Sequence, residues 1–342
     1  MAAEKEVTIY DIARKLGISP STVSRALSNH EVISEKTRTS VQEAARKMNY
    51  HPNRFARSLR LKRTSTLGVI VPKLNSYFMA TVIAGIESVA SKYGYNLIIA
   101  NSQESEKKEA EGLHTLYNSR VDGLIVSLAF DSDRMKHFGT ILKKGIPVVF
   151  FDRVSESDGY TRVRIDNFMA GYEVTSHLAD QGCVRIMHVG GNMLINVYRD
   201  RYLGYRKALE EKGLQYEESL VITGDLSEKS GTETAKKIIK MKNRPDAIFT
   251  ANDTTAVTII LNLKKAGISV PGDIAVAGFN NEPVSRVIEP NLTTVNYPAY
   301  EIGESAATML VNKLGSEPDG FRSDVLLKHE LVIRESSVKK LL

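Results

Sequence analysis

The stretch from Thr8 to Ser28 reads TIYDIARKLGISPSTVSRALS and predicts two short helices joined by a sharp turn. Thr8 is placed to cap the first helix, because its hydroxyl can accept a hydrogen bond from an unpaired amide of the first turn. Gly17 supplies the positive φ with which a chain commonly leaves a helix. Ser19 caps the second helix, and Pro20 occupies its first position, where the missing N–H costs nothing.

The second helix divides into an apolar face and a small polar face. Val23, Ala26 and Leu27 are predicted to face inward. The residues left pointing outward are Ser21, Thr22, Ser24 and Arg25. Such a face suits the major groove of DNA, since arginine can donate two hydrogen bonds to guanine and hydroxyls can reach phosphates or base edges. The alternative is an ordinary helical hairpin with a solvated face.

The basic charge of the chain is concentrated near its N-terminus. Up to Arg63 there are 13 Lys and Arg against 6 Asp and Glu, a net charge of +7. The whole chain carries +6, so the remaining 279 residues hold 33 basic and 34 acidic side chains, a net charge of −1. A basic head on a neutral body is typical of proteins that bind phosphate backbones, which favours double-stranded DNA as a partner.

Length and cysteine content set further bounds. A chain of 342 residues is too long for one compact core and indicates two or three units. The single cysteine, Cys183, excludes a disulfide framework and fits a reducing compartment. The N-terminus is charged, without an apolar signal segment, and no apolar run approaches transmembrane length. We therefore expect a soluble, cytoplasmic protein with no membrane partner.

One more helix and a linker are predicted before a long α/β body. Ser34 can cap the third helix, and His51-Pro52 ends it, because the residue before a proline avoids helical angles. The segment 53–60 is helix-compatible but too short to be stable alone, so it is either a basic tether or a helix that folds only on DNA. From Leu67 onwards, roughly ten apolar runs of strand length alternate with amphipathic helices, which predicts two doubly wound parallel sheets. The break between the sheets is expected near Asp166-Asn167.

Polar side chains directly follow several of these apolar runs, at the strand ends where open parallel sheets bind their ligands. Carboxylate, amide, guanidinium and aromatic groups together suit a polyhydroxylated ligand. Two neighbouring residues have simpler interpretations, Asp253 as part of a helix cap and Asn281 as part of a turn. The candidate ligand-binding residues are Ser76, Tyr77, Phe78, Asp152, Arg199, Arg201, Asn252 and Asn280.

The sequence contains no recognisable catalytic motif. There is no Gly-x-Ser-x-Gly elbow and no phosphate-binding Gly-x-x-x-x-Gly-Lys, and the pair Gly190-Gly191 is by itself only a weak signal. The seven histidines show no metal-ligand spacing. We therefore expect no enzyme activity, no metal and no cofactor. A solute-binding component of sugar uptake is the other alternative, and the basic head argues against it.

Eight short motifs occur along the chain: Thr8–Leu27, Tyr50–Asn53, Ala56–Leu59, Asp152-Arg153, Arg199-x-Arg201-x-x-Gly204-Tyr205, Ala251–Asp253, Val276–Phe279 and Leu292–Val295. Several of them are weak individually, but their combination in this order and spacing is highly specific. On these motifs the chain resembles the LacI/GalR transcriptional regulators, from Val7 nearly to the C-terminus.

The resemblance implies three parts: a helix-turn-helix head over residues 1–52, a hinge helix and linker over 53–64, and a core like that of periplasmic sugar-binding proteins over 65–342. The chain is implied to cross three times between an N-subdomain (about residues 65–164 plus 296–322) and a C-subdomain (about 165–295 plus 323–342). Leu59 of paired hinge helices is implied to enter the minor groove and kink the duplex. The implied DNA-binding residues are Thr8, Tyr10, Ser19, Pro20, Ser21, Thr22, Ser24, Arg25, Asn53, Arg54, Ala56, Arg57 and Leu59.

The resemblance also adds Leu226 and Tyr297 to the expected ligand site. Pro20-Ser21 stands where the lactose-type repressor has larger hydrogen-bonding side chains, so the operator sequence is not carried over. Asn280-Asn281 replaces an acidic pair that is common in sugar-binding members. A neutral sugar or sugar derivative remains the first expectation, since Asp152 would repel an anion; an acidic or phosphorylated sugar and a purine co-repressor are the alternatives.

The expected assembly is a homodimer on a pseudo-palindromic operator, because the sequence ends soon after the last predicted strand and leaves no room for an added tetramerising helix. The combined prediction is a repressor whose operator affinity is controlled by a small ligand between two α/β subdomains.

Overall fold

The computed structural model describes residues 7–50, 63–129, 136–154, 160–315 and 323–339. The chain forms two compact units, Met1–Thr64 and Ser65–Leu342. The first unit is called the head and the second the core. The predicted hinge residues between 53 and 62 lie outside the described residues.

The head is a small bundle of helices around one apolar centre. At its start, Thr8 and Asp11 form a capping box, in which the Asp11 carboxylate accepts hydrogen bonds from the Thr8 amide (2.9 Å) and from the Thr8 hydroxyl (2.7 Å). Gly17 ends the first helix with a φ of 65°, and Ser19 caps the second by accepting from the Thr22 amide at 3.1 Å. The buried centre combines Ile12 and Val23 with residues of the third helix. The helices are α1 (Ile9–Leu16), α2 (Pro20–Leu27) and α3 (Glu35–Lys47).

The first lobe of the core is built on a six-stranded sheet whose pairs are all parallel. Alternate residues of its strands face opposite sides, so that Val149 packs with α5 and α12 while Phe150 packs with α6 and α7. In sheet order the strands are β11 (Asp324–Leu327), β5 (Thr161–Ile165), β4 (Val148–Phe151), β3 (Gly123–Val126), β1 (Thr66–Val71) and β2 (Asn96–Asn101). The helices are α5 (Tyr77–Lys92), α6 (Glu106–Asn118), α7 (Lys136–Lys143) and α12 (Ala299–Gly315).

The second lobe repeats this plan on a four-stranded parallel sheet. Two apolar clusters cover its faces, one shared with α8 and α9 and the other with α10 and α11. The strands in order are β7 (Val221–Thr223), β6 (Ile186–Gly190), β8 (Ala247–Thr250) and β9 (Ala275–Ala277). The helices are α8 (Asn167–Asp180), α9 (Asn196–Glu211), α10 (Glu228–Lys240) and α11 (Asp253–Lys265), with short turns η1 (Glu218–Leu220) and η2 (Pro283–Arg286). The predicted α/β class with two parallel sheets is confirmed.

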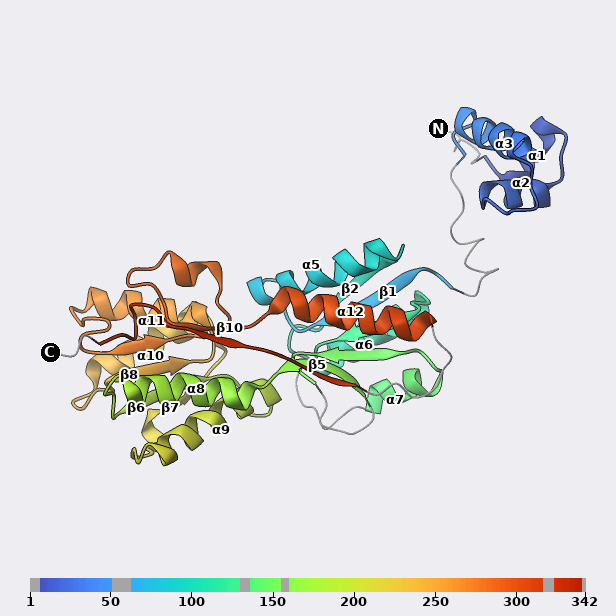
Figure 1. Ribbon diagram of the computed structural model, residues 1–342. Coiled ribbons are helices and arrows are strands. Elements are labelled where there is room, and N and C mark those ends of the chain that lie inside the picture. The colour runs from blue at the N-terminus through green and yellow to red at the C-terminus, as the bar shows by residue number, and fades with distance from the viewer. Residues whose placement is uncertain (1–6, 51–62, 130–135, 155–159, 316–322, 340–342) are drawn as a thin grey trace, which may run out of the picture. The chain divides into compact units, whose positions relative to one another are not determined.

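The chain crosses between the lobes after β5, after β10 and between β11 and β12, as Figure 1 shows. β10 (Thr294–Asn296) and β12 (Glu330–Val332) form an antiparallel pair beside the second lobe. Neither β11 nor β12 was predicted. β11 also corrects the expected subdomain boundary, because residues 324–327 pair with β5 in the first lobe instead of belonging to the C-subdomain. The Arg164 guanidinium holds Asp324 across this pair with two hydrogen bonds, so β11 covers what would otherwise be an open sheet edge.

Both lobes contain a closely packed helix pair with glycines at the contact. In the first lobe α5 and α12 lie side by side (Figure 1), and a Cβ on Gly303 would overlap the Val82 carbonyl oxygen. In the second lobe a Cβ on Gly204 of α9 would overlap the carbonyl oxygen of Phe168 in α8. A Cβ on Gly171 of α8 would in turn overlap the carbonyl oxygen of Arg201. Close packing of α8 on α9 therefore fixes the backbone position of Arg201.

Candidate functional site

The head presents a polar surface around the start of α2. Tyr10 is 63% exposed although it is aromatic, and the Ser19 hydroxyl lies within hydrogen-bond distance of the hydroxyls of Ser21 (2.7 Å) and Thr22 (2.8 Å). Of the predicted DNA-binding residues, Thr8, Tyr10, Ser19, Ser21 and Arg25 are exposed, whereas Pro20, Thr22 and Ser24 are half-buried. The other five, Asn53, Arg54, Ala56, Arg57 and Leu59, lie outside the described residues.

In the core, Asp152 is the central acidic residue of the predicted ligand site. It follows β4 in the left-handed region, with a φ of 56°, and is only 4% exposed. The Tyr297 hydroxyl donates to its Oδ1 at 2.7 Å. Burial raises the pKa of Asp152 from its ordinary value, although Arg153, the Tyr297 hydrogen bond and Arg201 lower it. Among the described residues no other side chain donates to this carboxylate, so further oxygen lone pairs can accept hydrogen bonds.

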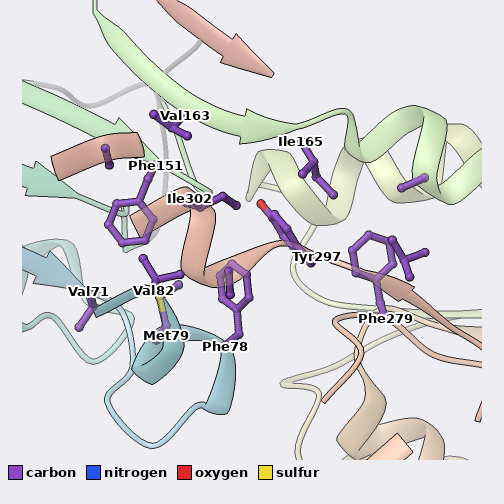
Figure 2. Close-up of a cluster of buried hydrophobic side chains, with 14 of the residues drawn as sticks. Val71, Phe78, Met79, Val82, Phe151, Val163, Ile165, Phe279, Tyr297 and Ile302 are labelled. Atoms are coloured by element: carbon purple, nitrogen blue, oxygen red, sulfur yellow. The ribbon is translucent and has the colours of Figure 1, made fainter. Parts of the chain in front are cut away.

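Tyr297 is held by the aromatic residues around it. Figure 2 shows its ring between Phe78 of the first lobe and Phe279 of the second. The ring centroids lie 4.6 Å from Phe78 and 6.1 Å from Phe279, the latter edge-on. Burial, followed by the nearby Asp152 charge, raises the pKa of Tyr297 well above its ordinary value. The phenol therefore stays protonated and acts as a hydrogen-bond donor to Asp152.

Arg201 is a buried cation with no carboxylate hydrogen-bonded to it among the described residues. It is 3% exposed; its Nε donates to Asn167 Oδ1 at 2.8 Å and its Nη1 to the Ala251 carbonyl at 2.9 Å. The guanidinium carbon lies 3.5 Å from the centroid of the Phe279 ring, a cation–π contact. Burial lowers the pKa of Arg201, but the group remains charged at neutral pH. Its remaining N–H groups can donate to a ligand.

Several other predicted ligand residues also have structural contacts. The Ser76 hydroxyl accepts from the Met79 amide at 3.5 Å to cap α5, and Tyr77 beside it is 54% exposed. Asn252 caps α11 through the Thr255 amide and donates to the carbonyl of Leu226, which has a φ of 57°. Arg199 donates to Asp200, and Asn280 donates weakly to Glu282 at 3.4 Å.

Asp253 and Asn281 both make structural contacts, but the helix-cap interpretation of Asp253 is wrong, because Asn252 caps α11. Asp253 is fully buried, and it accepts from the Thr294 hydroxyl and the Glu282 amide, both at 2.7 Å. Burial raises its pKa to about 7 despite these bonds. Asn281 accepts from Arg334 at 2.7 Å and donates to Asn296 at 3.0 Å. Both residues hold the loop that follows β9 and are not available to a ligand in this arrangement.

Known proteins resemble this chain over nearly its whole length. The profile described as "Bacterial regulatory proteins, lacI family" matches residues 8–53, and that of a "Periplasmic binding protein-like domain" matches residues 175–337. Catabolite control protein A of Priestia megaterium is 33% identical over 332 residues, covering 97% of this chain and 99% of that protein. The chain belongs to the LacI family. It is therefore a DNA-binding transcriptional regulator, as predicted.

Two further family members are informative. The HTH-type transcriptional repressor PurR of Photobacterium profundum is 34% identical and covers 96% of this chain and 98% of its own length. A crystal structure of the Lac repressor dimer bound to operator and the anti-inducer ONPF has a TM-score of 0.89 and 26% identity, covering 98% of this chain and all of that one. The similarity thus includes both the head and the core of this LacI-family chain.

Sequence reasoning did not identify three residues that the structure brings next to Arg201. Asn167 accepts its Nε hydrogen bond, Phe279 lies under its guanidinium, and the Tyr198 ring centroid lies 5.8 Å from its Cζ. Phe279 belongs to a recognised motif, and Asn167 lies at the predicted break between the sheets. No pattern in the sequence pairs either residue with Arg201, because the contacts form only when the α8 and β9 ends meet α9.

A buried histidine lies behind the site. His188 in β6 is fully buried and stacks on Tyr205 at 5.1 Å, and neither ring nitrogen has a hydrogen-bond partner among the described residues. Burial, and then the positive charge of Arg201, lower its pKa to about 3. The unfolded chain takes up a proton at this histidine as the pH falls through about 6.5, whereas the folded chain does not until about 3. Over that range, His188 makes the folded state less stable as the pH falls.

We therefore expect His188→Leu to reduce the pH dependence of stability. Between pH 7.5 and pH 5, the wild-type chain should lose about 2 kcal/mol more unfolding free energy than the variant, which lacks this titrating group. Urea denaturation of both proteins at the two pH values measures the difference, and all other titrating groups cancel in the comparison. Parallel pH profiles for the two proteins would show that His188 is not held neutral by its surroundings.

Within the described part of the chain, His, Cys, Asp and Glu form no group of three or more that could hold a metal ion. The same residues include no helix long and apolar enough to span a membrane.

Proposed function

We propose that this chain is a transcriptional repressor whose affinity for a pseudo-palindromic operator is controlled by a sugar or sugar derivative bound beside Asp152 and Arg201. The Asp152 carboxylate carries this proposal. It is 96% buried and accepts one described side-chain hydrogen bond, from Tyr297, so it can still accept from two ligand hydroxyls. Burying a carboxylate without hydrogen-bond donors costs free energy, and hydroxyl groups of a ligand would reduce that cost by donating to it.

The neighbouring groups fit the same ligand class. Asp152 can accept a hydrogen bond from one hydroxyl of a vicinal pair, and Arg201 can donate a hydrogen bond to the other. Phe78, 7% exposed, and Tyr297 supply aromatic surface for an apolar sugar face. Asn280, with an amide instead of a carboxylate, lowers the negative charge nearby. An acidic or phosphorylated sugar that pairs with Arg201 or Arg199 is thus a variant of the same proposal.

A purine is the second candidate. The Phe78 and Tyr297 rings, tilted by 40° to each other, supply aromatic surface against which a purine can pack, and PurR is among the relatives. A thermal-shift screen of the full chain against neutral sugars, sugar phosphates, sugar acids and purines separates the candidates. A ligand at about one hundred times its dissociation constant stabilises the folded chain by about 2.7 kcal/mol. A shift with purines alone would replace the sugar proposal by the purine one, and a shift with neither class would contradict both.

The proposed recognition of operator bases depends on Arg25, which is exposed in the last turn of α2. Arg25→Ala should reduce specific binding by about 1–3 kcal/mol and relax the preference at one base pair in each half-site. Arg25→Lys is the matched variant, because it keeps the charge but loses the planar pair of donors that fits guanine. It should retain affinity for random DNA while losing much of the specificity.

Selection of bound duplexes from a randomised library, followed by titrations of each variant, measures both effects. If Arg25→Ala selects the same sequence as the wild-type chain, α2 does not read bases through Arg25. Two-fold symmetry of the selected sequence tests the proposed dimer.

A further inference from the structure

Arg153 contacts both lobes of the core. It lies directly after β4 in the first lobe and is 5% exposed. Its Nη1 donates to Glu104 Oε2 (2.5 Å) and its Nη2 to Glu104 Oε1 (3.1 Å), and Nη1 also donates to the Ala129 carbonyl at 3.2 Å. All of these partners belong to the first lobe. The remaining bond, from Nη2 to the Tyr198 hydroxyl at 3.3 Å, reaches α9 of the second lobe.

The Tyr198 ring is itself fixed in position. It packs over Gly191, where a Cβ would overlap the ring. The guanidinium carbons of Arg153 and Arg201 lie 5.6 Å and 5.8 Å from its centroid. The negative face of an aromatic ring attracts cations at these distances. One ring in the second lobe is thus attracted by a buried arginine from each lobe.

A weaker electrostatic attraction also acts between the lobes. The Lys73 Nζ lies 3.7 Å from Glu104 Oε1. In the second lobe, hydrogen bonds from Ser227 lower the pKa of Asp225, and the positive charge of Lys73 lowers it further. Charges therefore alternate from Arg153 through Glu104 and Lys73 to Asp225. This order favours the approach of the lobes, although the exposed part of it is screened by salt.

We propose that Arg153, Glu104 and Tyr198 form a latch that holds the two lobes together in the arrangement seen here and needs no bound effector. Glu104 orients the arginine, and Arg153 supplies the hydrogen bond and the cation–π contact to Tyr198. The latch shifts the equilibrium between closed and open lobes. If an effector prefers one of these two forms, its affinity therefore depends in part on the latch. Only this last step rests on the proposed function.

The distance between the lobes tests the latch directly. Spin labels on Lys107→Cys in α6 and Lys242→Cys after α10 report on the first and second lobes, since both positions are exposed. The native Cys183 is 1% exposed, and burial raises its pKa to about 11, so it resists labelling. Pulsed electron paramagnetic resonance on the full chain, diluted with unlabelled chain and without ligand or DNA, gives the distance distribution within one chain.

Tyr198→Phe removes the hydroxyl and keeps the ring, whereas Glu104→Gln removes the charge that orients Arg153. Each should move the distribution toward a second, open population, with a change of about three- to tenfold in the closed-to-open ratio. Tyr202→Phe is the matched control on the same helix, because the Tyr202 hydroxyl pairs with Tyr216 at 3.1 Å inside the second lobe. It should leave the distribution unchanged.

Two outcomes would overturn the latch. One is a distribution that is the same in the wild-type chain, Tyr198→Phe and Glu104→Gln. The other is an equal broadening in Tyr202→Phe, which would mean that α9 has loosened within its own lobe. Because neither ligand nor DNA is added, a failed effector screen leaves this measurement intact, and a failed latch leaves the effector proposal intact.

Discussion

Gly204→Ala should destabilise the core by about 3 kcal/mol or more. A Cβ at this position would overlap the carbonyl oxygen of Phe168 and approach the amide nitrogen of Tyr172, both of them backbone atoms of α8. Backbone atoms cannot move aside as the end of a flexible side chain can, so α8 and α9 must separate along their contact. Added methyl groups in packed interiors commonly cost about 1–3 kcal/mol, and a clash against backbone lies at or above the upper end. Urea denaturation of the full chain measures the loss.

Gly139→Ala provides the matched control. Gly139 also lies inside a helix, α7, but a Cβ there would meet nothing within 4 Å. Alanine forms helices better than glycine, so this variant should be unchanged or more stable by up to about 1 kcal/mol. Similar denaturation midpoints for the two variants would show that α8 and α9 can adjust to a side chain at Gly204.

The Gly204 contact shows why part of the fold could be read from the sequence and part could not. Gly204 appears in a motif that identifies the family, but the sequence alone gives no reason for a glycine there. The reason is the close approach of Phe168, which comes from the preceding helix and is seen only when α8 packs on α9. Most strands were predictable because parallel strands covered on both faces are continuous apolar runs.

β11 and β12 lack that signal. β11 at the edge of the first sheet alternates exposed and half-buried residues, and Leu326 is 54% exposed. β12 has only three residues and none of them is buried. Both strands are defined by their partners, β5 and β10, and not by their own composition. For this reason the sequence predicts the third crossing before β11, whereas in the structure the chain crosses after β11.

The predicted strand ends located polar groups of the candidate site, but they did not predict which residues those groups contact. Asp152 directly follows an apolar strand and Arg201 lies in the helix after another, and the structure buries both near Tyr297. Asn252 also lies where expected, although its side chain caps α11 and holds Leu226. The contacts of Arg201 with Asn167 and Phe279 depend on helix packing, which hydrophobic periodicity does not encode.

The second large effect is expected at Arg201. Arg201→Met keeps an apolar stem but removes the donors that Arg201 can offer to a ligand, and it leaves Asn167 and the Ala251 carbonyl without their present donor. Hydrogen bonds to a buried charge contribute about 1.5–3 kcal/mol each, so affinity for the ligand found by the thermal-shift screen should fall about ten- to a hundredfold. Isothermal calorimetry measures this affinity. Arg206→Met on the same helix is the control, because Arg206 is exposed and lies over Tyr216 at 4.1 Å.

The same variant should also change how ligand binding depends on pH. The charge of Arg201 lowers the pKa of Asp152, whereas burial raises it, so losing Arg201 moves this pKa further upward. A protonated Asp152 loses acceptor sites for ligand hydroxyls, and the residual affinity of Arg201→Met should therefore fall more steeply with decreasing pH than that of the wild-type chain. Equal slopes would mean that Asp152 does not accept from the ligand. Linkage gives an independent check, because a ligand that alters operator affinity must itself bind with altered affinity to the operator complex, by the same factor.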